Sequence, residues 1–254
     1  MKALTYGPYT IELFTAENCR GIIYAVMDQQ DAKETWRLLE WHSLALAAIS
    51  GVDWNRELSP WKAPKAFRGG EDFGGQGSTL LDTLTQQIIP LTENHLGYAP
   101  GFRGIAGYSL AGLFALWAVY QTDLFDRAAS ISGSLWFDGF LEFMKNNTPK
   151  AKFIYLSLGD KEKLAKNPRL TAVEDCTRRA AELLEAHNIP VVFEMNRGGH
   201  FQDIPARIAR GVSSLTTSSP AGMQAFRNWI HSIPLVTGRD LWYHGLNCGR
   251  ERSP

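Results

Sequence analysis

A serine near the middle of the chain lies in a setting that suits a catalytic nucleophile. The residues GYSLAG at positions 107–112 follow a short apolar run and precede a longer, helical one. This order predicts a strand, a tight turn with Ser109 at its tip and a helix, the nucleophile elbow GxSxG with Ala111 at the second glycine. Small residues are needed on both sides of the serine because the strand and the helix pass close together. An ordinary serine near a helix start is the alternative, and the apolar run after Ser109 favours the elbow, since a helix buried beside a sheet is apolar all round.

A histidine late in the chain is the candidate general base. His200 stands in GGHF at positions 198–201, directly after a predicted strand at 191–195. Elbow serines take their partners in the chain order serine, acid, histidine, from loops that follow later strands. The two glycines permit a loop that returns the imidazole to Ser109, where it would take the serine proton and later protonate the leaving alcohol. The other five histidines lack such a setting: His42, His95, His187, His231 and His244.

Two carboxylates compete for the place of the acid that orients His200. Asp160 and Glu162 both follow a predicted strand at 153–158, in the segment GDKE. The acid in loops of the form GxxD stands at the third position after the glycine, which favours Glu162 over Asp160. Asp138, after the preceding strand, is a more distant candidate. A carboxylate that does not serve as the acid would be a turn or helix-cap residue.

Two backbone N–H groups are the candidates for an oxyanion hole. The amide of Leu110 begins the predicted helix and therefore has no intrahelical acceptor. The second donor comes from a loop that follows an earlier strand. The apolar run 44–49 predicts that strand, and the amide of Val52, or less favourably of Asp53, follows it. An ordinary strand-to-loop turn at Gly51 is the alternative.

A long segment without a regular period, residues 54–77, follows the expected oxyanion loop. Loops of this length inside a compact domain are usually functional. The segment combines aromatic rings with cations, which suits a bulky anionic or aromatic acyl group. Candidate substrate contacts in it and beside the elbow are Trp54, Arg56, Trp61, Arg68, Tyr108 and Trp136. The alternative is that the aromatic rings pack the loop onto the domain while the cations face water.

Composition places the chain among ordinary globular proteins. Its 254 residues, 44% hydrophobic and 20% charged, suit one large α/β domain spanning residues 1–254. Lys+Arg and Asp+Glu are each 26, so no overall charge favours nucleic acid or an anionic membrane. Cys19, Cys176 and Cys248 are odd in number and widely spaced, which favours free thiols in a reducing compartment.

The expected location and partners of the protein also follow from its sequence. The N-terminus lacks the apolar stretch of a signal peptide and no run reaches transmembrane length, so a cytoplasmic protein without membrane contact is expected. No group of His, Cys or Asp residues has metal-ligand spacing, and neither a metal nor a cofactor is expected. The expected partner is a small ester substrate, and the oligomeric state is left open.

The elements that must hold these groups alternate between strands and helices, which predicts a mostly parallel sheet with helices on both faces. Two early strands, 9–15 and 21–27, are expected to form an antiparallel hairpin, and 44–49 a central parallel strand. Further strands are expected at 127–132, 153–158 and 191–195, and helices at 79–96 and 171–187, with Pro90 as a kink or boundary. Residues 31–40 are expected to form a short polar helix or an irregular excursion. The pattern is lost in an atypical tail, about 216–254, which contains one predicted helix at 221–230.

Three motifs together resemble the Putative esterase family of α/β-hydrolases, which includes esterase D-like enzymes and enterobactin-type siderophore esterases. They are the GYSLAG elbow, LSLGDKE after a strand and GGHF after the last strand, and the similarity covers roughly residues 10–210. The resemblance implies an α/β-hydrolase fold, hydrolysis of carboxylic esters, and Ser109 and His200 as catalytic residues. It adds a siderophore-type lactone as one candidate substrate. Some relatives act with a serine–histidine pair alone, and the tail after Gly211 departs from the usual ending, a short helix after the histidine.

Three other readings compete with ester hydrolysis. Relatives with the same triad transfer the acyl group to an alcohol, and the sequence does not separate transfer from hydrolysis. A catalytically inactive binding protein on the hydrolase fold is disfavoured because Ser109 and His200 are both present. A nucleotide-dependent reductase is disfavoured because no GxGxxG follows the early strand.

Overall fold

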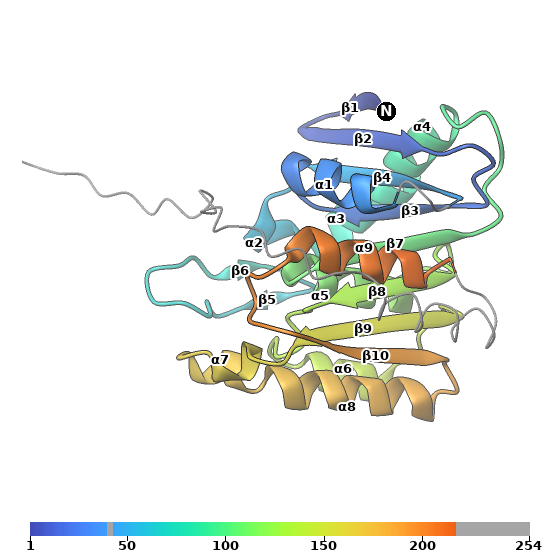
Figure 1. The fold of residues 1–254 in the computed structure, drawn as a ribbon. Coiled ribbons are helices and arrows are strands. Elements are labelled where there is room, and N and C mark those ends of the chain that lie inside the picture. Colours follow the sequence, from blue (N-terminus) through green and yellow to red (C-terminus); the bar gives the residue numbers. More distant parts are fainter. Residues whose placement is uncertain (40–42, 217–254) are drawn as a thin grey trace, which may run out of the picture.

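A computed structural model describes residues 1–39 and 43–216, and within them an eight-stranded sheet forms the centre of the protein (Figure 1). Its strand order is β1-β2-β4-β3-β7-β8-β9-β10. The strands are β1 (Lys2–Tyr6), β2 (Tyr9–Thr15), β3 (Gly21–Val26), β4 (Leu44–Ser50), β7 (Arg103–Tyr108), β8 (Arg127–Ile131), β9 (Phe153–Gly159) and β10 (Val191–Asn196). From β4 to β10 all neighbours are parallel, whereas β2 runs antiparallel to both β1 and β4. The predicted mostly parallel sheet is confirmed.

Helices cover both faces of this sheet, as predicted. One face carries α1 (Gln29–Leu39) and α9 (Ile204–Ser214), which pack side by side in front of the strands in Figure 1. The other face carries α5, α6, α8 and a helical segment built of three consecutive parts. Their bounds are α5 (Leu110–Gln121), α6 (Phe140–Asn146), α8 (Val173–Ala186), α3 (Gly77–Thr83), the π-helical turn η1 (Leu84–Ile88) and α4 (Ile89–Glu93).

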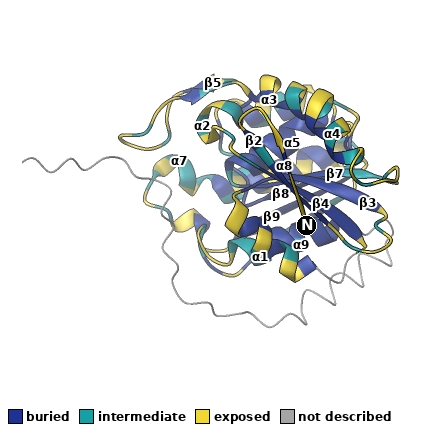
Figure 2. Ribbon diagram, turned by 90° about the horizontal axis from the view of Figure 1, so that it is seen from above, coloured by how far each residue is buried: buried dark blue, intermediate teal, exposed yellow. Residues whose placement is uncertain are grey.

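The core is formed by side chains that alternate between the two faces of the strands and by α5, the helix that follows the elbow. On β3, Tyr24 faces the layer that contains α5, while Ile23 faces the layer that contains α9. The helix α5 is buried at every position from Leu110 to Tyr120. Figure 2 shows the strands buried at the centre and exposure concentrated on the outer helices and loops. A helix that is apolar all round is thus fixed beside the middle of the sheet, and it fixes the turn that precedes it.

Small elements gather at the carboxyl ends of the parallel strands. They are α2 (Trp54–Glu57), the short hairpin of β5 (Lys62–Ala63) and β6 (Phe73–Gly74), the 3₁₀ turn η2 (Glu162–Leu164) and α7 (Pro168–Thr171). The segment 54–77, predicted as a loop, therefore contains one helical turn and a two-stranded hairpin. In Figure 1 the hairpin and α7 both project from the same side of the molecule.

The predicted hairpin between residues 9–15 and 21–27 is wrong, although both segments are strands. In the sheet β4 lies between them, so that β2 pairs with β4 and β3 pairs with β4 and β7. The antiparallel hairpin is formed instead by β1 and β2, whose register pairs Tyr6 with Tyr9 across a two-residue turn. Apolar matching decides the register here, because it places Ile11 opposite the buried Ile49.

The helices differ from the predicted ones at two points in the chain. Pro90 does mark a boundary, since a π-helical turn ends directly before α4, and a proline has no N–H for the regular i→i−4 bond. A helix missed in the sequence, α9, follows the segment that carries His200. The predicted helix at 221–230 and the rest of the tail lie outside the described residues. Within the described ranges, no helix has both the length and the apolar character needed to cross a bilayer.

Candidate active site

Ser109 occupies the turn between β7 and α5 in a conformation that L-residues rarely adopt. Its φ is 57° and its ψ −119°, and its N–H donates to the carbonyl of Ile131 at 3.0 Å. A Cβ on Gly107 would lie 2.2 Å from the carbonyl oxygen of Ala111, so the glycine at this point is required. The methyl group of Ala111 is buried in the space that the glycine leaves, which explains how the elbow accepts alanine at the second small position.

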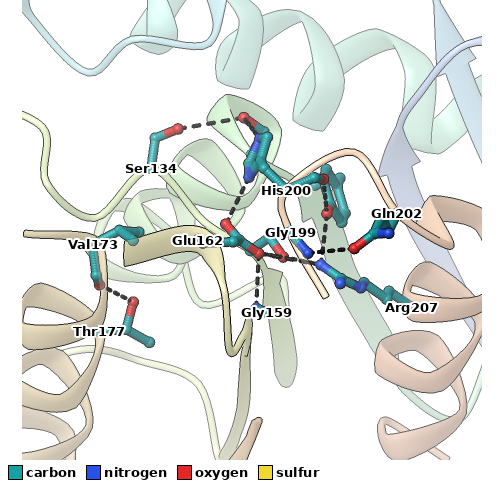
Figure 3. Close-up of polar contacts among 12 residues, drawn as sticks. Ser134, Gly159, Glu162, Val173, Thr177, Gly199, His200, Gln202 and Arg207 are labelled. Carbon is teal, nitrogen blue, oxygen red and sulfur yellow. Dashed lines mark hydrogen bonds and ion pairs between the residues drawn. The ribbon is translucent and has the colours of Figure 1, made fainter. Parts of the chain in front are cut away.

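Three side chains from three separate loops form one hydrogen-bonded series, and Figure 3 shows its Glu162–His200 part. The Ser109 Oγ lies 3.0 Å from His200 Nε2. On the other side of the ring, His200 Nδ1 lies 2.7 Å from Glu162 Oε2. With a proton on Nδ1 donated to the carboxylate, Nε2 is an acceptor for the serine hydroxyl, which is the arrangement that general-base activation of a serine needs.

The carboxylate of Glu162 is buried, and its second oxygen is surrounded by donors. Oε1 accepts hydrogen bonds from Ser132 Oγ at 2.7 Å, from the Gly159 N–H at 2.8 Å and from Arg207 Nη1 at 3.2 Å. Burial raises the pKa of the Glu162 carboxyl, but the hydrogen bond and charge of His200, with the Ser132 and Gly159 donors, outweigh it and hold that pKa below its usual value. The Glu162 carboxylate is therefore charged near neutral pH.

The other two acid candidates are held elsewhere. Asp160 Oδ1 accepts the Gly198 N–H at 2.8 Å, so its carboxylate closes the turn that leads to His200 without contacting the imidazole. Asp138 Oδ1 pairs with Arg169 Nη2 at 2.8 Å. A Cβ on Gly159 would lie 2.3 Å from the carbonyl oxygen of Gly198, so this glycine lets the two loops approach closely enough for the Glu162–His200 contact.

The turn that carries His200 is itself fixed through its backbone. The Tyr108 hydroxyl donates to the His200 carbonyl at 2.5 Å, and the Gly199 N–H donates to Gln202 Oε1 at 2.6 Å. Tyr108 is buried, and burial raises the pKa of its hydroxyl to about 12, so it remains a donor at physiological pH. The Tyr108 hydroxyl therefore lies between the His200 backbone and Arg207 Nη1, which is 3.2 Å away, and contact of Tyr108 with substrate stays a prediction.

The two predicted oxyanion donors lie at the ends of β4 and β7. Leu110 is the first residue of α5, where an N–H has no intrahelical acceptor. Asp53 is unavailable as the alternative donor, because its N–H bonds Glu57 Oε2 at 2.7 Å while its side chain caps α2 at the Arg56 N–H. In the described part of the chain the Val52 N–H has no hydrogen-bond acceptor, and it stands between β4 and α2.

The predicted substrate-binding aromatics divide into packed and exposed groups. Trp61 donates from Nε1 to the Asp138 carbonyl at 2.9 Å and its ring contacts the rings of Phe137, Phe140 and Phe143. Trp136 is half-buried between the Phe73 ring and the Arg169 guanidinium. These residues pack the 54–77 segment onto the domain. Exposed side chains remain at Trp54, Arg56, Lys62, Lys65, Phe67 and Arg68.

Sequence reasoning missed the groups behind the triad-like series. Ser132 follows β8 with a φ of 46°, Ser134 Oγ lies 3.5 Å from Ser109 Oγ, and Arg207 lies on the missed helix α9. A signal for Arg207 was present, since it stands beside Ile208 and one turn before Gly211 and Val212, on the apolar side of an amphipathic segment. A cation on such a side predicts a buried ion pair.

The model of the protein family described as "Putative esterase" matches residues 25–203, which include the elbow, the Glu162 turn and His200. In sequence the chain is 33% identical over 124 residues to a Bacillus subtilis (strain 168) protein described as "Uncharacterized protein YbbA". That match covers 47% of this chain and 50% of the other protein, so the chain matches about half the length of this curated relative.

Three solved structures with a similar fold are described as hydrolases or as an esterase. The siderophore hydrolase EstA from Aspergillus nidulans has a TM-score of 0.66 at 17% identity, over 83% of this chain and 90% of that one. An IroE-like serine hydrolase from Shewanella oneidensis has a TM-score of 0.67 at 17% identity, over 82% and 74%. The enterobactin esterase FES from Shigella flexneri has a TM-score of 0.60 at 16% identity, over 82% and 55%. At these identities the likeness establishes the fold, and the predicted α/β-hydrolase fold is confirmed.

The lowered pKa of Glu162 predicts how stability depends on pH. Because the folded-state pKa is depressed, the ionised carboxylate stabilises the fold above the unfolded value of about 4.3, and this contribution is lost as the pH falls through the folded value. The free energy of unfolding should therefore be higher for the wild type than for Glu162→Gln at pH 7, and the difference should shrink as the pH falls below about 4. Urea titrations at several pH values measure it.

Glu142→Gln is the matched control for this measurement, since Glu142 is an exposed carboxylate on α6. It should change the free energy of unfolding little at any pH. A difference between wild type and Glu162→Gln that stays constant from pH 7 to pH 3 would contradict the assignment of a depressed pKa.

Proposed function

The chain belongs to the Putative esterase family, and we propose that it is a serine hydrolase that cleaves carboxylic esters through an acyl-enzyme on Ser109. The observation that carries the proposal is the continuous series from Ser109 Oγ to His200 Nε2 at 3.0 Å and from His200 Nδ1 to Glu162 Oε2 at 2.7 Å. A serine in an elbow turn, a base within hydrogen-bond reach and an acid that orients the base are the parts that nucleophilic catalysis requires.

In the proposed acylation step, Ser109 Oγ attacks the ester carbonyl carbon while His200 Nε2 takes the hydroxyl proton. The carbonyl oxygen becomes an oxyanion, for which the N–H groups of Leu110 and Val52 are the proposed donors. The C–O bond to the alcohol then breaks, and the imidazolium gives its proton to the departing oxygen. Glu162 holds the ring in place and balances the imidazolium charge during both transfers.

Deacylation reverses the same roles with water in place of the alcohol. His200 takes a proton from water, the hydroxide oxygen attacks the acyl carbon, and Ser109 Oγ leaves with the proton that His200 returns. An added alcohol in place of water would give a new ester, and product analysis with such acceptors separates transfer from hydrolysis.

The substrate that we propose is a siderophore-type ester or lactone with an anionic aromatic acyl group. Three neighbours in fold are described as siderophore hydrolases or an enterobactin esterase. The hairpin between β5 and β6 exposes three cations and a ring: Lys62, Lys65, Arg68 and Phe67. It is fixed to the helix after the Glu162 turn, because Arg169 Nη1 donates to the Pro64 carbonyl at 2.9 Å and Asn167 Nδ2 to the Ala66 carbonyl at 2.5 Å. A rigid cationic and aromatic rim close to the acid turn suits such an acyl group.

Removing the nucleophile tests the reaction directly. Ser109→Ala and His200→Ala should each lower kcat/KM for p-nitrophenyl acetate by roughly a thousandfold or more while the protein stays folded. A fluorophosphonate should label wild-type protein on Ser109, as peptide mass spectrometry would show, and should not label Ser109→Ala. The exposed Ser78→Ala is the control and should behave as wild type. Turnover by Ser109→Ala close to that of wild type would refute the mechanism.

The choice of acid is tested by a pair of equal-sized substitutions. Glu162→Gln should lower kcat far more than Asp160→Asn, because only Glu162 contacts the imidazole and an amide cannot balance the imidazolium charge. Steady-state kinetics at the pH optimum measures both. The opposite ranking would move the acid to Asp160, and small losses in both variants would point to a serine–histidine pair acting alone.

The role of the cationic rim is tested by charge removal. A variant with Lys62, Lys65 and Arg68 changed to alanine should lose preference for an enterobactin-like trilactone over a neutral ester of similar size, measured as the ratio of kcat/KM values. The matched control replaces three cations that end α6 or precede β9, at the opposite edge of the sheet: Lys145, Lys150 and Lys152. A preference that is absent in wild type, or equal in both variants, would exclude the rim as the site of selection.

A further inference from the structure

A buried cation stands behind the proposed acid, on the helix that follows the histidine turn. Arg207 is on α9, and its side chain is 3% exposed. Buried arginines are uncommon because removal of the guanidinium from water must be offset by hydrogen bonds and an opposite charge. Figure 3 shows the Arg207 side chain directed at Glu162 from the side away from His200. The proposed mechanism does not yet give this group a role.

The guanidinium contacts four separate parts of the site. Nη1 lies 3.2 Å from Glu162 Oε1, 3.4 Å from Ser132 Oγ and 3.2 Å from the Tyr108 hydroxyl. Nη2 donates to the carbonyl of Arg197 at 2.9 Å. Arg197 begins the turn that carries the histidine, and Tyr108 holds the histidine carbonyl. One planar side chain therefore touches both the acid and the two supports of the base.

We propose that Arg207 is a positioning residue that holds Glu162 ionised and aimed at His200 and holds the His200 turn against the same carboxylate. The inference rests on the proposed function and assigns a residue to it that the mechanism does not itself require. Oε1 is occupied by three donors, so the carboxyl group cannot rotate, and Oε2 is left for the imidazole. Rigid support of this kind keeps the reacting groups within the small tolerance that catalysis demands.

The second part of the role proposed for Arg207 is to balance the charge of the Glu162 carboxylate. The groups that face the Glu162 carboxylate are His200 from its turn, Arg207 from α9, Tyr108 from β7 and the donors Ser132 and Gly159, while the nearby Asp160 is turned to Gly198. Arg207 is the only permanent cation among them. Without it, a buried carboxylate would face a neutral imidazole, and it would take up a proton at a higher pH. An unbalanced carboxylate also favours the protonated imidazole, which cannot accept the serine proton.

Both effects shift the acid limb of the pH profile, which is the fall in kcat/KM at low pH, to higher pH. In Arg207→Met the acid limb of kcat/KM should shift to higher pH by about one unit, the effect of losing an opposite charge at short range. The plateau value of kcat should also fall, by up to about a hundredfold, because the acid and the turn lose their common support. Arg207→Lys should keep the limb at the wild-type position but lower kcat, since one ammonium keeps the charge and cannot replace the fork of hydrogen bonds.

The same helix supplies a matched control. Arg210 lies one turn further along α9 and pairs with Glu194 Oε1 at 3.3 Å, away from the triad-like series. Arg210→Met removes a cation of the same kind from the same helix, and it should leave the acid limb in place. If the role of Arg207 were purely structural, activity would fall only in proportion to the fraction of folded protein, and the acid limb would stay at the wild-type pH, as in Arg210→Met. An unmoved acid limb in Arg207→Met would therefore overturn the proposal.

A stability cycle tests the pairing without any ester. Arg207→Met should lower the Tm more in the wild-type background than in Glu162→Gln, because only the former leaves a buried carboxylate unpaired. If Arg207→Met does not fold, the double variant with Glu162→Gln should still fold, and this rescue is then the test of the pairing. Equal losses of Tm in both backgrounds, or a double variant that also fails to fold, would refute the pairing.

Turnover and labelling of the wild type separate this inference from the proposed function. Absence of ester turnover and of fluorophosphonate labelling in the wild type would refute the function, whatever the Arg207 variants do. A wild type that is active and labelled, combined with an unmoved acid limb in Arg207→Met, would refute only the role of Arg207. The rate of labelling as a function of pH gives the same limb independently of the choice of ester.

Discussion

The carboxylate of Glu162 carries its charge at a point from which water is almost wholly excluded. Such a group is tolerated only where donors and an opposite charge replace the lost hydration. Its donors come from the ends of β8 and β9, from α9 and from the turn after β10. The strand order β7-β8-β9-β10 brings three of these ends to one edge, and the packing of α9 on the opposite face from α5 supplies the fourth. The sheet topology is thus a condition for an ionised acid at this place.

The geometry of the elbow is set by a different constraint, which is steric. Ser109 must stand above the sheet edge in an unfavourable backbone conformation, and the helix behind it must leave the strand at once. The burial of α5 along its whole apolar length supplies the stabilisation that offsets this strain. The strained turn and the buried acid meet through a single imidazole, so small displacements of either element change the distance over which a proton moves.

Much of this arrangement could be predicted from local patterns, because each depends on residues close in sequence. The elbow needs only the small residues around Ser109 and the apolar run after it, and the His200 turn needs only its glycines. The neighbour of β2 could not be read in this way, since it depends on whether β4 enters between two strands that are adjacent in the chain. Arg207 was missed for a similar reason, because its partners Tyr108, Ser132 and Glu162 are 45 to 99 residues away in sequence. The packing of Trp61 on an aromatic cluster likewise depends on residues 76 to 82 positions later.

The place of α9 in the chain has a consequence for the order in which the site becomes complete during synthesis. Ser109, Glu162 and His200 all leave the ribosome before Arg207, and α9 then has to dock against α1, an element made near the start. Until that docking, the carboxylate lacks its permanent counter-charge, and water or a proton must take the place of the guanidinium. The residues of the elbow turn are therefore made early, whereas the counter-charge of the Glu162 carboxylate is a late product of tertiary folding.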